Sequence, residues 1–142
     1  MKFGGVGVRF PDPESKNYNN TAFVPDDFGF EVQIDELARP DGADIHRTGA
    51  IYRKDGRADG ETLTLKPARA VGEWNDYEIQ VKDQLYTVKL NGDVVCVFDN
   101  ANRYLNRGVA STAAAPSFIG LQCYADPNSR VAFRHIRMQA IP

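Results

Sequence analysis

The sequence is poor in the features that mark several classes of protein. Its 17 basic and 19 acidic side chains leave a net charge of −2 without a basic patch, so it offers no electrostatic footprint for a nucleic acid. No apolar run approaches the roughly 20 residues of a membrane-spanning helix. The opening residues, MKFGGVGVRF, hold one Lys and no long apolar stretch, so they do not form a signal peptide. We therefore expect no nucleic-acid partner and no membrane partner.

Sulfur and imidazole side chains are also scarce, with two Cys and two His in 142 residues. Cys96 and Cys123 lie in apolar strand patterns and their spacing fits no metal motif, so buried free thiols are favoured over a disulfide. The rest of the composition is ordinary: 42% hydrophobic and 25% charged residues suffice for one globular core. The chain, residues 1–142, is therefore predicted to form a single domain.

Alternation of apolar and polar residues is the main pattern of the chain, and we find no convincing helix. In FGFEVQIDEL it places the apolar residues from Phe28 to Ile34 on one face, which is typical of a half-buried strand. Asn91-Gly92 is the strongest hairpin signal. Strands are expected over 6–10, 28–35, 48–53, 61–66, 77–82, 85–90, 94–98, 118–125 and 130–141, with a bulge at Arg134-His135. This pattern predicts an all-β fold, an antiparallel β-sandwich.

Seven short segments occur in an order that resembles a known family. They are GVGVRF, GFEVQI, TGAIY, KPARAVGEWNDYEIQV, LNGDVV, FIGLQ and VAFRHIRM, and together they cover nearly the whole chain. The sequence is similar to the 3-keto-disaccharide hydrolase domain family, whose fold is a concanavalin-like or laminin-G-like jelly roll. The resemblance implies a carbohydrate ligand, and a secreted or periplasmic location in bacteria.

The chain departs from the family pattern in three places. Family members usually carry a further segment before the stretch that matches GVGVRF, so the resemblance implies that the usual N-terminal strands are lacking here. Exposed sheet edges would follow, and with them a homo-oligomer that pairs those edges. The family often reads Leu-Gln-Asp-His-Gly before its last strand, where this chain has LQCYADPNSR, and its usual Arg-Asn-Ile is here Arg134-His135-Ile136. These two changes put catalysis in doubt and leave the fold expectation intact.

The resemblance and the residue types together nominate a set of site residues. Glu31 and His46 are the candidate catalytic bases, since a carboxylate or an imidazole can accept a proton near neutral pH. The candidate substrate-binding residues are Arg9, Gln33, Tyr52, Lys66 and Trp74.

Each nomination has a structural alternative. The polar face of Glu31 and Gln33 is either a ligand site or a solvated outer face. Arg9 either contacts the sugar or pairs with Glu31, and the two roles are compatible. A single histidine in a loop, such as His46, is more often a solvent-exposed side chain than a catalytic base. Trp74 is either a platform for the apolar face of a sugar or a plug at a strand entrance, and the core plug is favoured.

The chemistry that the resemblance implies starts from the ketone at C3 of the sugar. The ketone acidifies the C2 proton, so a base removes it, the enolate expels the glycosidic oxygen from C1, and water then adds back. The site needs one base and a group that polarises the ketone, by hydrogen bond, charge or metal. Arg9, Gln33 or a bound cation would polarise it. No metal ligands are assigned, although calcium on the acidic residues between Asp35 and Asp44 stays open.

Two other classes of function fit the same sequence. One is a non-catalytic carbohydrate-binding module, favoured by the absence of the His-bearing turn of the family. The other is an assembly module that pairs its exposed sheet edges with another chain. The sequence alone therefore does not decide whether the protein is an enzyme.

Overall fold

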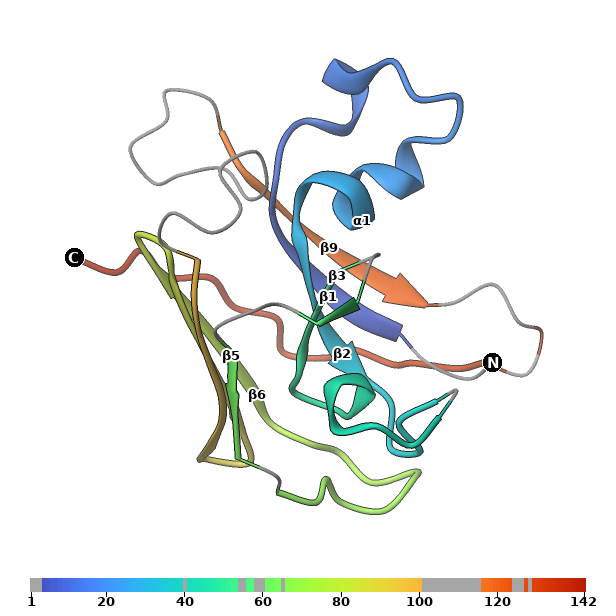
Figure 1. Cartoon of the computed structure of the whole chain (residues 1–142), viewed down its shortest axis with the longest axis vertical. Coiled ribbons are helices and arrows are strands. Elements are labelled where there is room, and N and C mark those ends of the chain that lie inside the picture. Colours follow the sequence, from blue (N-terminus) through green and yellow to red (C-terminus); the bar gives the residue numbers. More distant parts are fainter. Residues whose placement is uncertain are drawn as a thin grey trace.

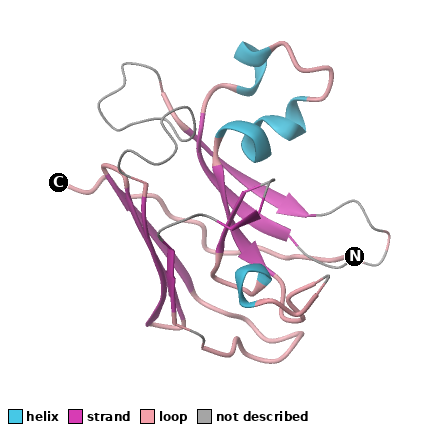
Figure 2. Cartoon of the chain, in the orientation of Figure 1, coloured by secondary structure: helices cyan, strands magenta, loops and turns pink. Residues whose placement is uncertain are grey.

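The computed structural model describes residues 4–39, 41–53, 56–57, 61–64, 66–100, 116–123, 127 and 129–142. In this part of the chain two antiparallel sheets face each other, with short helical segments outside one of them (Figures 1 and 2). The all-β prediction is thus confirmed. No helix in the described ranges is both long and apolar enough to cross a membrane.

The first sheet has five strands in the order β4-β3-β2-β1-β9. Its strands are β1 (Gly4–Phe10), β2 (Phe30–Ile34), β3 (Ile51–Arg53), β4 (Gly56–Arg57) and β9 (Phe118–Cys123). The second sheet has four strands in the order β5-β8-β7-β6. Its strands are β5 (Glu61–Leu63), β6 (Tyr77–Lys82), β7 (Leu85–Leu90) and β8 (Asp93–Asp99). All pairings described within the two sheets are antiparallel.

The hydrophobic core lies between the inner faces of the two sheets. Its aromatic centre is formed by Phe30 of β2 with Tyr86 and Phe98 of the opposite sheet, and the ring centroids of Phe30 lie 5.2 and 5.0 Å from theirs. Aliphatic residues of β1, β2, β3, β7 and β8 complete it. In β2 and β7 the period-two pattern predicted the inner face correctly, because alternate side chains of a strand point to opposite faces. In β8 the adjacent residues Val95 and Cys96 are both buried, next to a shift in the pairing with β7.

The turns of the second sheet follow from residues that tolerate a positive φ. Asn91 and Gly92 have φ angles of 53° and 92°, which suits the tight hairpin between β7 and β8. Asp83, with φ 53°, turns the chain between β6 and β7. Both turns stand where the sequence predicted them.

The segment before β2 was predicted less well. It contains the 3₁₀ helices Pro13–Lys16 and Thr21–Phe23 and the short helix α1 (Val24–Phe28), so the expectation of no helix was wrong. Pro25 in the first turn of α1 suits a helix start, because proline fixes φ near its helical value and the first turn lacks backbone acceptors for its N–H groups. Phe28 therefore ends α1 instead of beginning β2, and its ring packs edge-on against Tyr18.

The predicted last strand, 130–141, is also wrong. The structure assigns no strand within 129–142, and His135 has a φ of 53°. The positive φ of His135 stands at the predicted irregularity, but no strand is assigned on either side of it. Ile136 and Met138, expected on an apolar strand face, are exposed.

The two cysteines are free, as expected, but only one is buried. Cys96 of β8 lies in the core, whereas Cys123 at the end of β9 is exposed. The expectation for Cys123 was wrong because β9 is the edge of its sheet and residues at its end are only partly covered.

Candidate functional site

The polar side chains of β2 are buried on the outer face of the five-stranded sheet. Glu31 is 8% exposed and Gln33 is 3% exposed, while Phe30 and Val32 between them point into the core. A solvated outer face, the alternative reading for these two residues, is therefore excluded. Buried polar side chains on the face away from the hydrophobic core need a structural or a functional reason.

Glycines on the neighbouring strand make room for these side chains. The register pairs Gly5 of β1 with Gln33 and Gly7 with Glu31. A Cβ atom added at Gly5 would lie 2.2 Å from Oε1 of Glu31, so the glutamate side chain lies directly across this glycine. β1 thus forms a floor without side chains under the carboxyl group.

A third polar residue reaches the same face from β9. Gln122 pairs with Gly5 on the side opposite Gln33, so the two glutamines flank the same glycine. One buried oxygen on each of three residues has no hydrogen-bond partner: Oε1 of Glu31, Oε1 of Gln33 and Oε1 of Gln122. Buried acceptors without donors are rare in native proteins, and a group of three indicates a place for donors supplied by a ligand or by water.

The helix α1 supplies the charge nearest to this cluster. Gln122 Nε2 donates to Asp26 Oδ1 in a long hydrogen bond of 3.5 Å. Burial, together with the smaller effect of the negative charge of Asp26, raises the pKa of Glu31 to about 7, against the opposing effect of a hydrogen bond from Gln122. A carboxyl group with this pKa is a proton acceptor matched to neutral pH.

The backbone of Tyr52 in β3 pairs with Glu31. Two predicted site residues, Glu31 and Gln33, therefore lie on one face of one sheet, beside the strand that carries Tyr52.

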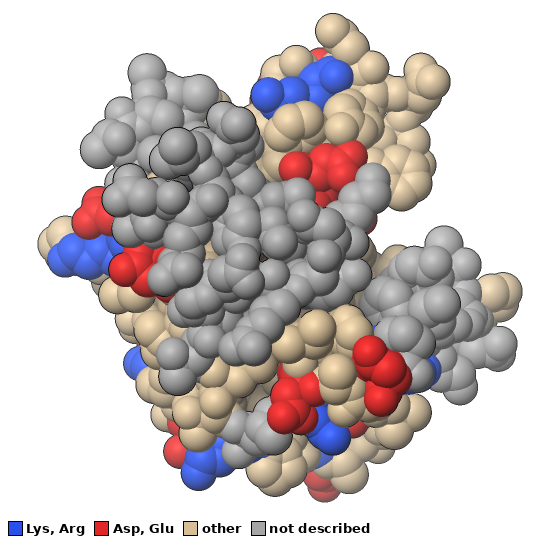
Figure 3. Space-filling model, viewed as in Figure 1, with Lys and Arg blue, Asp and Glu red and all other residues tan. Residues whose placement is uncertain are grey.

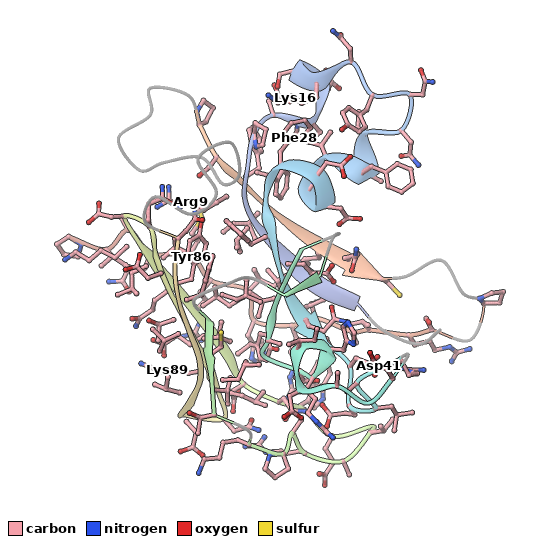
Figure 4. All side chains as sticks on the ribbon, viewed as in Figure 1. Arg9, Lys16, Phe28, Asp41, Tyr86 and Lys89 are labelled. Carbon is pink, nitrogen blue, oxygen red and sulfur yellow. The ribbon has the colours of Figure 1, made fainter. Side chains whose placement is uncertain are left out.

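Arg9 does not join them. The pairing of β1 with β9 shifts between Val8 and Phe10, and Arg9 in the shifted position has a φ of 57°. The guanidinium of Arg9 lies close enough to Tyr86 of the opposite sheet to lower the pKa of its hydroxyl, against the larger effect of burial (Figure 4). Among the described residues Arg9 and Glu31 form no ion pair, so the predicted pairing of these two is wrong.

His46 lies in the loop beyond the end of β2, away from the cluster. It ends a 3₁₀ helix (Asp44–His46), and its Nδ1 is 2.8 Å from Oδ1 of Asp41. No hydrogen bond or ion pair given by the described residues connects His46 with Glu31. The two predicted bases are therefore not brought together.

The acidic residues of this loop do not converge on a metal position. Asp35 is buried and accepts from the backbone of Leu37 and from Arg39, whose Nη2 lies 2.9 Å from its Oδ1. Asp44 pairs with Arg47. Within the described part of the chain, no group of three His, Cys, Asp or Glu side chains is placed to hold a metal ion. Charged residues visible in Figure 3 form small groups of both signs.

The two remaining predicted residues lie by the other sheet. Trp74 precedes β6, is 41% exposed, and carries the guanidinium carbon of Arg134 at 3.9 Å from its ring centroid. The favoured reading of Trp74 as a core plug is therefore wrong. Lys66, between β5 and β6, is exposed. Neither residue has a described contact with the Glu31 cluster.

Sequence reasoning missed Asp26 and Gln122. Asp26 was hidden because the helix that carries it was not predicted. Gln122 had a signal, since in FIGLQC it alternates with Leu121 and so takes the face opposite to the apolar residues. Its position beside Gln33 depends on the pairing of β1 with β9, which connects segments more than 100 residues apart and has no local signature.

The protein is thus an antiparallel β-sandwich with a buried, partly unsatisfied polar cluster on the outer face of one sheet. The family described as the 3-keto-alpha-glucoside-1,2-lyase-like domain matches residues 3–139, so the chain belongs to this family and the resemblance seen in the sequence is confirmed. Comparisons with curated proteins and with solved structures gave no match.

Proposed function

We propose that the protein cleaves 3-keto-glycosides by eliminating the group at C1, with Glu31 as the base. The family membership supports a carbohydrate-active domain of this lyase-like kind. The observation that carries the proposal is the buried Glu31 carboxyl beside the unsatisfied amide oxygens of Gln33 and Gln122. Such a cluster suits a ligand rich in hydroxyl donors, and the base next to it has a pKa of about 7.

The proposed reaction needs one proton transfer at the protein. The carboxylate of Glu31 takes the C2 proton, and the C–H electron pair forms the double bond between C1 and C2. The bond from C1 to the glycosidic oxygen breaks, and the leaving oxygen takes up a proton from solvent water to give the alcohol. Addition of water across the double bond would complete a net hydrolysis. The reaction therefore does not require the two opposed carboxylates of ordinary glycosidases.

The ketone oxygen needs a donor when negative charge develops on it. Gln33 is the candidate donor, since it lies on the same face as Glu31 and its amide carries two N–H donors. Arg9 is less suitable because its side chain lies toward Tyr86. A divalent cation bound by the buried oxygens would also stabilise the negative charge on the ketone oxygen. An assay with a chelator present tests for such a cation.

The direct test is release of the alcohol from a chromogenic 3-keto-glucoside, with and without a chelator. We expect Glu31→Gln to lower kcat/KM by about 10²-fold or more, the usual contribution of a general base. Glu78→Gln is the matched control, because Glu78 on β6 is an exposed carboxylate paired with Lys89. Unchanged turnover in Glu31→Gln would overturn the assignment. His46→Ala should leave turnover unchanged.

The pH profile gives a second readout. Because only the carboxylate accepts a proton, we expect kcat/KM to rise with pH and level off above the Glu31 pKa of about 7. A profile that is flat from pH 5 to 8 would contradict Glu31 as the base.

The second candidate function is carbohydrate binding without turnover. The unsatisfied oxygens favour it equally, because hydroxyl donors satisfy them whether or not a proton is transferred. Binding of a 3-keto-glucoside without release of its alcohol would identify this case.

A further inference from the structure

The amide of Gln122 has a defined orientation. An ionised carboxylate can only accept hydrogen bonds, so the amide group that faces Asp26 must present its nitrogen. The 3.5 Å contact joins Gln122 Nε2 and Asp26 Oδ1 accordingly. Oε1 of the same amide is therefore turned away from Asp26, and it is buried without a partner.

This orientation adds a third unsatisfied oxygen acceptor to the cluster. Oε1 of Gln122, Oε1 of Gln33 and Oε1 of Glu31 are all unsatisfied acceptors, and the two glutamines flank Gly5, over which the Glu31 side chain lies. The strand between them presents Gly5 and Gly7 to this face and so adds no side-chain donor. Arg9, the nearest basic residue of β1, lies toward Tyr86 instead.

We propose that Asp26 is a positioning residue that holds Gln122 with its oxygen toward the site, so that the site selects sugars by their own free hydroxyl donors. The inference rests on the proposed function for the identity of the ligand as a sugar. The inference adds a prediction about ligand specificity to the proposed function. Glycosides whose ring hydroxyls are removed or alkylated should bind poorly. A site built to bond a hydroxyl leaves its buried polar groups unpaired when that hydroxyl is missing.

Electrostatics support the same role for Asp26. Among the described residues, Asp26 carries the charge that raises the pKa of Glu31. Asp27, the next residue of α1, instead accepts a hydrogen bond of 2.8 Å from the Tyr18 hydroxyl. From β3, the backbone of Tyr52 pairs with Glu31, and β1 and β9 bring Gly5, Gly7 and Gln122, which do not titrate. Removing the Asp26 charge should therefore lower the pKa of Glu31.

The test uses Asp26→Asn, which keeps the side-chain shape but removes the carboxylate that requires the Gln122 nitrogen on that side. Asp27→Asn is the matched control, with the same charge change on the same helix. The first readout is the pKa of Glu31 in the free protein, followed by ¹³C NMR of its carboxyl carbon. We expect a downward shift in Asp26→Asn and none in Asp27→Asn.

The second readout is binding of methyl α-glucoside and its 2-deoxy and 4-deoxy analogues, measured by ligand-observed NMR. These probes lack the ketone and cannot react, so their binding is measured separately from elimination. The wild type should prefer the parent glycoside by about 10-fold or more over at least one analogue, and Asp26→Asn should reduce that preference. Gln122→Met, which removes the third acceptor and leaves Asp26 in place, should reduce it as well.

The outcomes separate this inference from the proposed function. Selective binding that depends on Asp26 and Gln122 supports it, even if no alcohol is released from a 3-keto-glucoside. Equal discrimination in the wild type and both variants, with an unchanged Glu31 pKa in Asp26→Asn, would overturn it. So would the failure of the wild type to bind any of the three glycosides.

Discussion

At the scale of single residues, the raised pKa of Glu31 links the site to stability. The group has an ordinary pKa of 4.5 in the unfolded chain and about 7 in the fold, so between these values the folded state holds more protons. Stability should therefore fall as the pH rises from about 4.5 to about 7, by about 3 kcal/mol in total, and level off above that.

Urea denaturation of the wild type and Glu31→Gln across this range checks the prediction. The glutamine variant cannot ionise, so its advantage in unfolding free energy should grow with pH by the same amount. Curves that stay parallel from pH 4.5 to 7 would show that Glu31 has an ordinary pKa in the folded protein.

Two core tyrosines give opposite predictions for the loss of a hydroxyl. The Tyr77 hydroxyl donates to the backbone oxygen of Gln33 at 2.7 Å, whereas the buried hydroxyl of Tyr86 has no partner. Tyr77→Phe should cost about 1 kcal/mol of stability, while Tyr86→Phe should be neutral or stabilising by a similar amount. Chemical denaturation of both variants tests the contrast, and an equal loss in both would refute it.

At the scale of elements, the site depends on the two glycines of β1, Gly5 and Gly7, which leave room for the Glu31 side chain. A methyl group at Gly5 would displace the Glu31 side chain, since its Oε1 and Cγ lie 2.2 and 2.6 Å from the added atom. Gly5→Ala should therefore lower elimination by about 100-fold, the usual effect of misplacing a catalytic group by about 1 Å. Gly120→Ala is the control, because its methyl group would meet the Phe10 ring at 3.2 Å. Similar losses in both variants would count against a specific role for Gly5.

The elements also show how far sequence reasoning reaches. Alternation and the Asn91-Gly92 turn predicted the second sheet because both signals are local. The same alternation placed Glu31 and Gln33 on one face but could not decide whether that face is buried, since the cover comes from α1 and β9. The side chain of Arg9 was predicted on the wrong face, because a one-residue shift with a positive φ reverses the direction in which it points. The residue types in Val-Arg-Phe give no signal of such a shift.

At the scale of the whole molecule, the two thiols offer a probe of global unfolding. Cys123 is exposed and Cys96 is fully buried, so a thiol reagent should modify one group rapidly and the second only as the fold opens. The slow phase should disappear in Cys96→Ala and persist in Cys123→Ser. Rapid reaction of two thiols in the native wild type would contradict the packing of β8.

We propose that the protein forms the expected homo-oligomer through the edge of the five-stranded sheet. β9 is a terminal strand of its sheet, and Ile119 and Leu121 on it are 56% and 49% exposed. A second copy that pairs β9 with β9 would cover both residues and extend the sheet across the two chains. Sedimentation over a range of concentrations distinguishes this dimer from a monomer, and Leu121→Lys should abolish it.

The packing of β2 has a consequence for how this sequence can change over evolutionary time. Phe30 and Val32 face the core while Glu31 and Gln33 face the site, so both sets of residues are interleaved along one strand. A single inserted or deleted residue in this strand would exchange the two sets, placing a carboxylate in the hydrophobic interior and a phenyl ring over Gly5. Variation in length is therefore confined to the connecting segments, while β2 can diverge only by substitution.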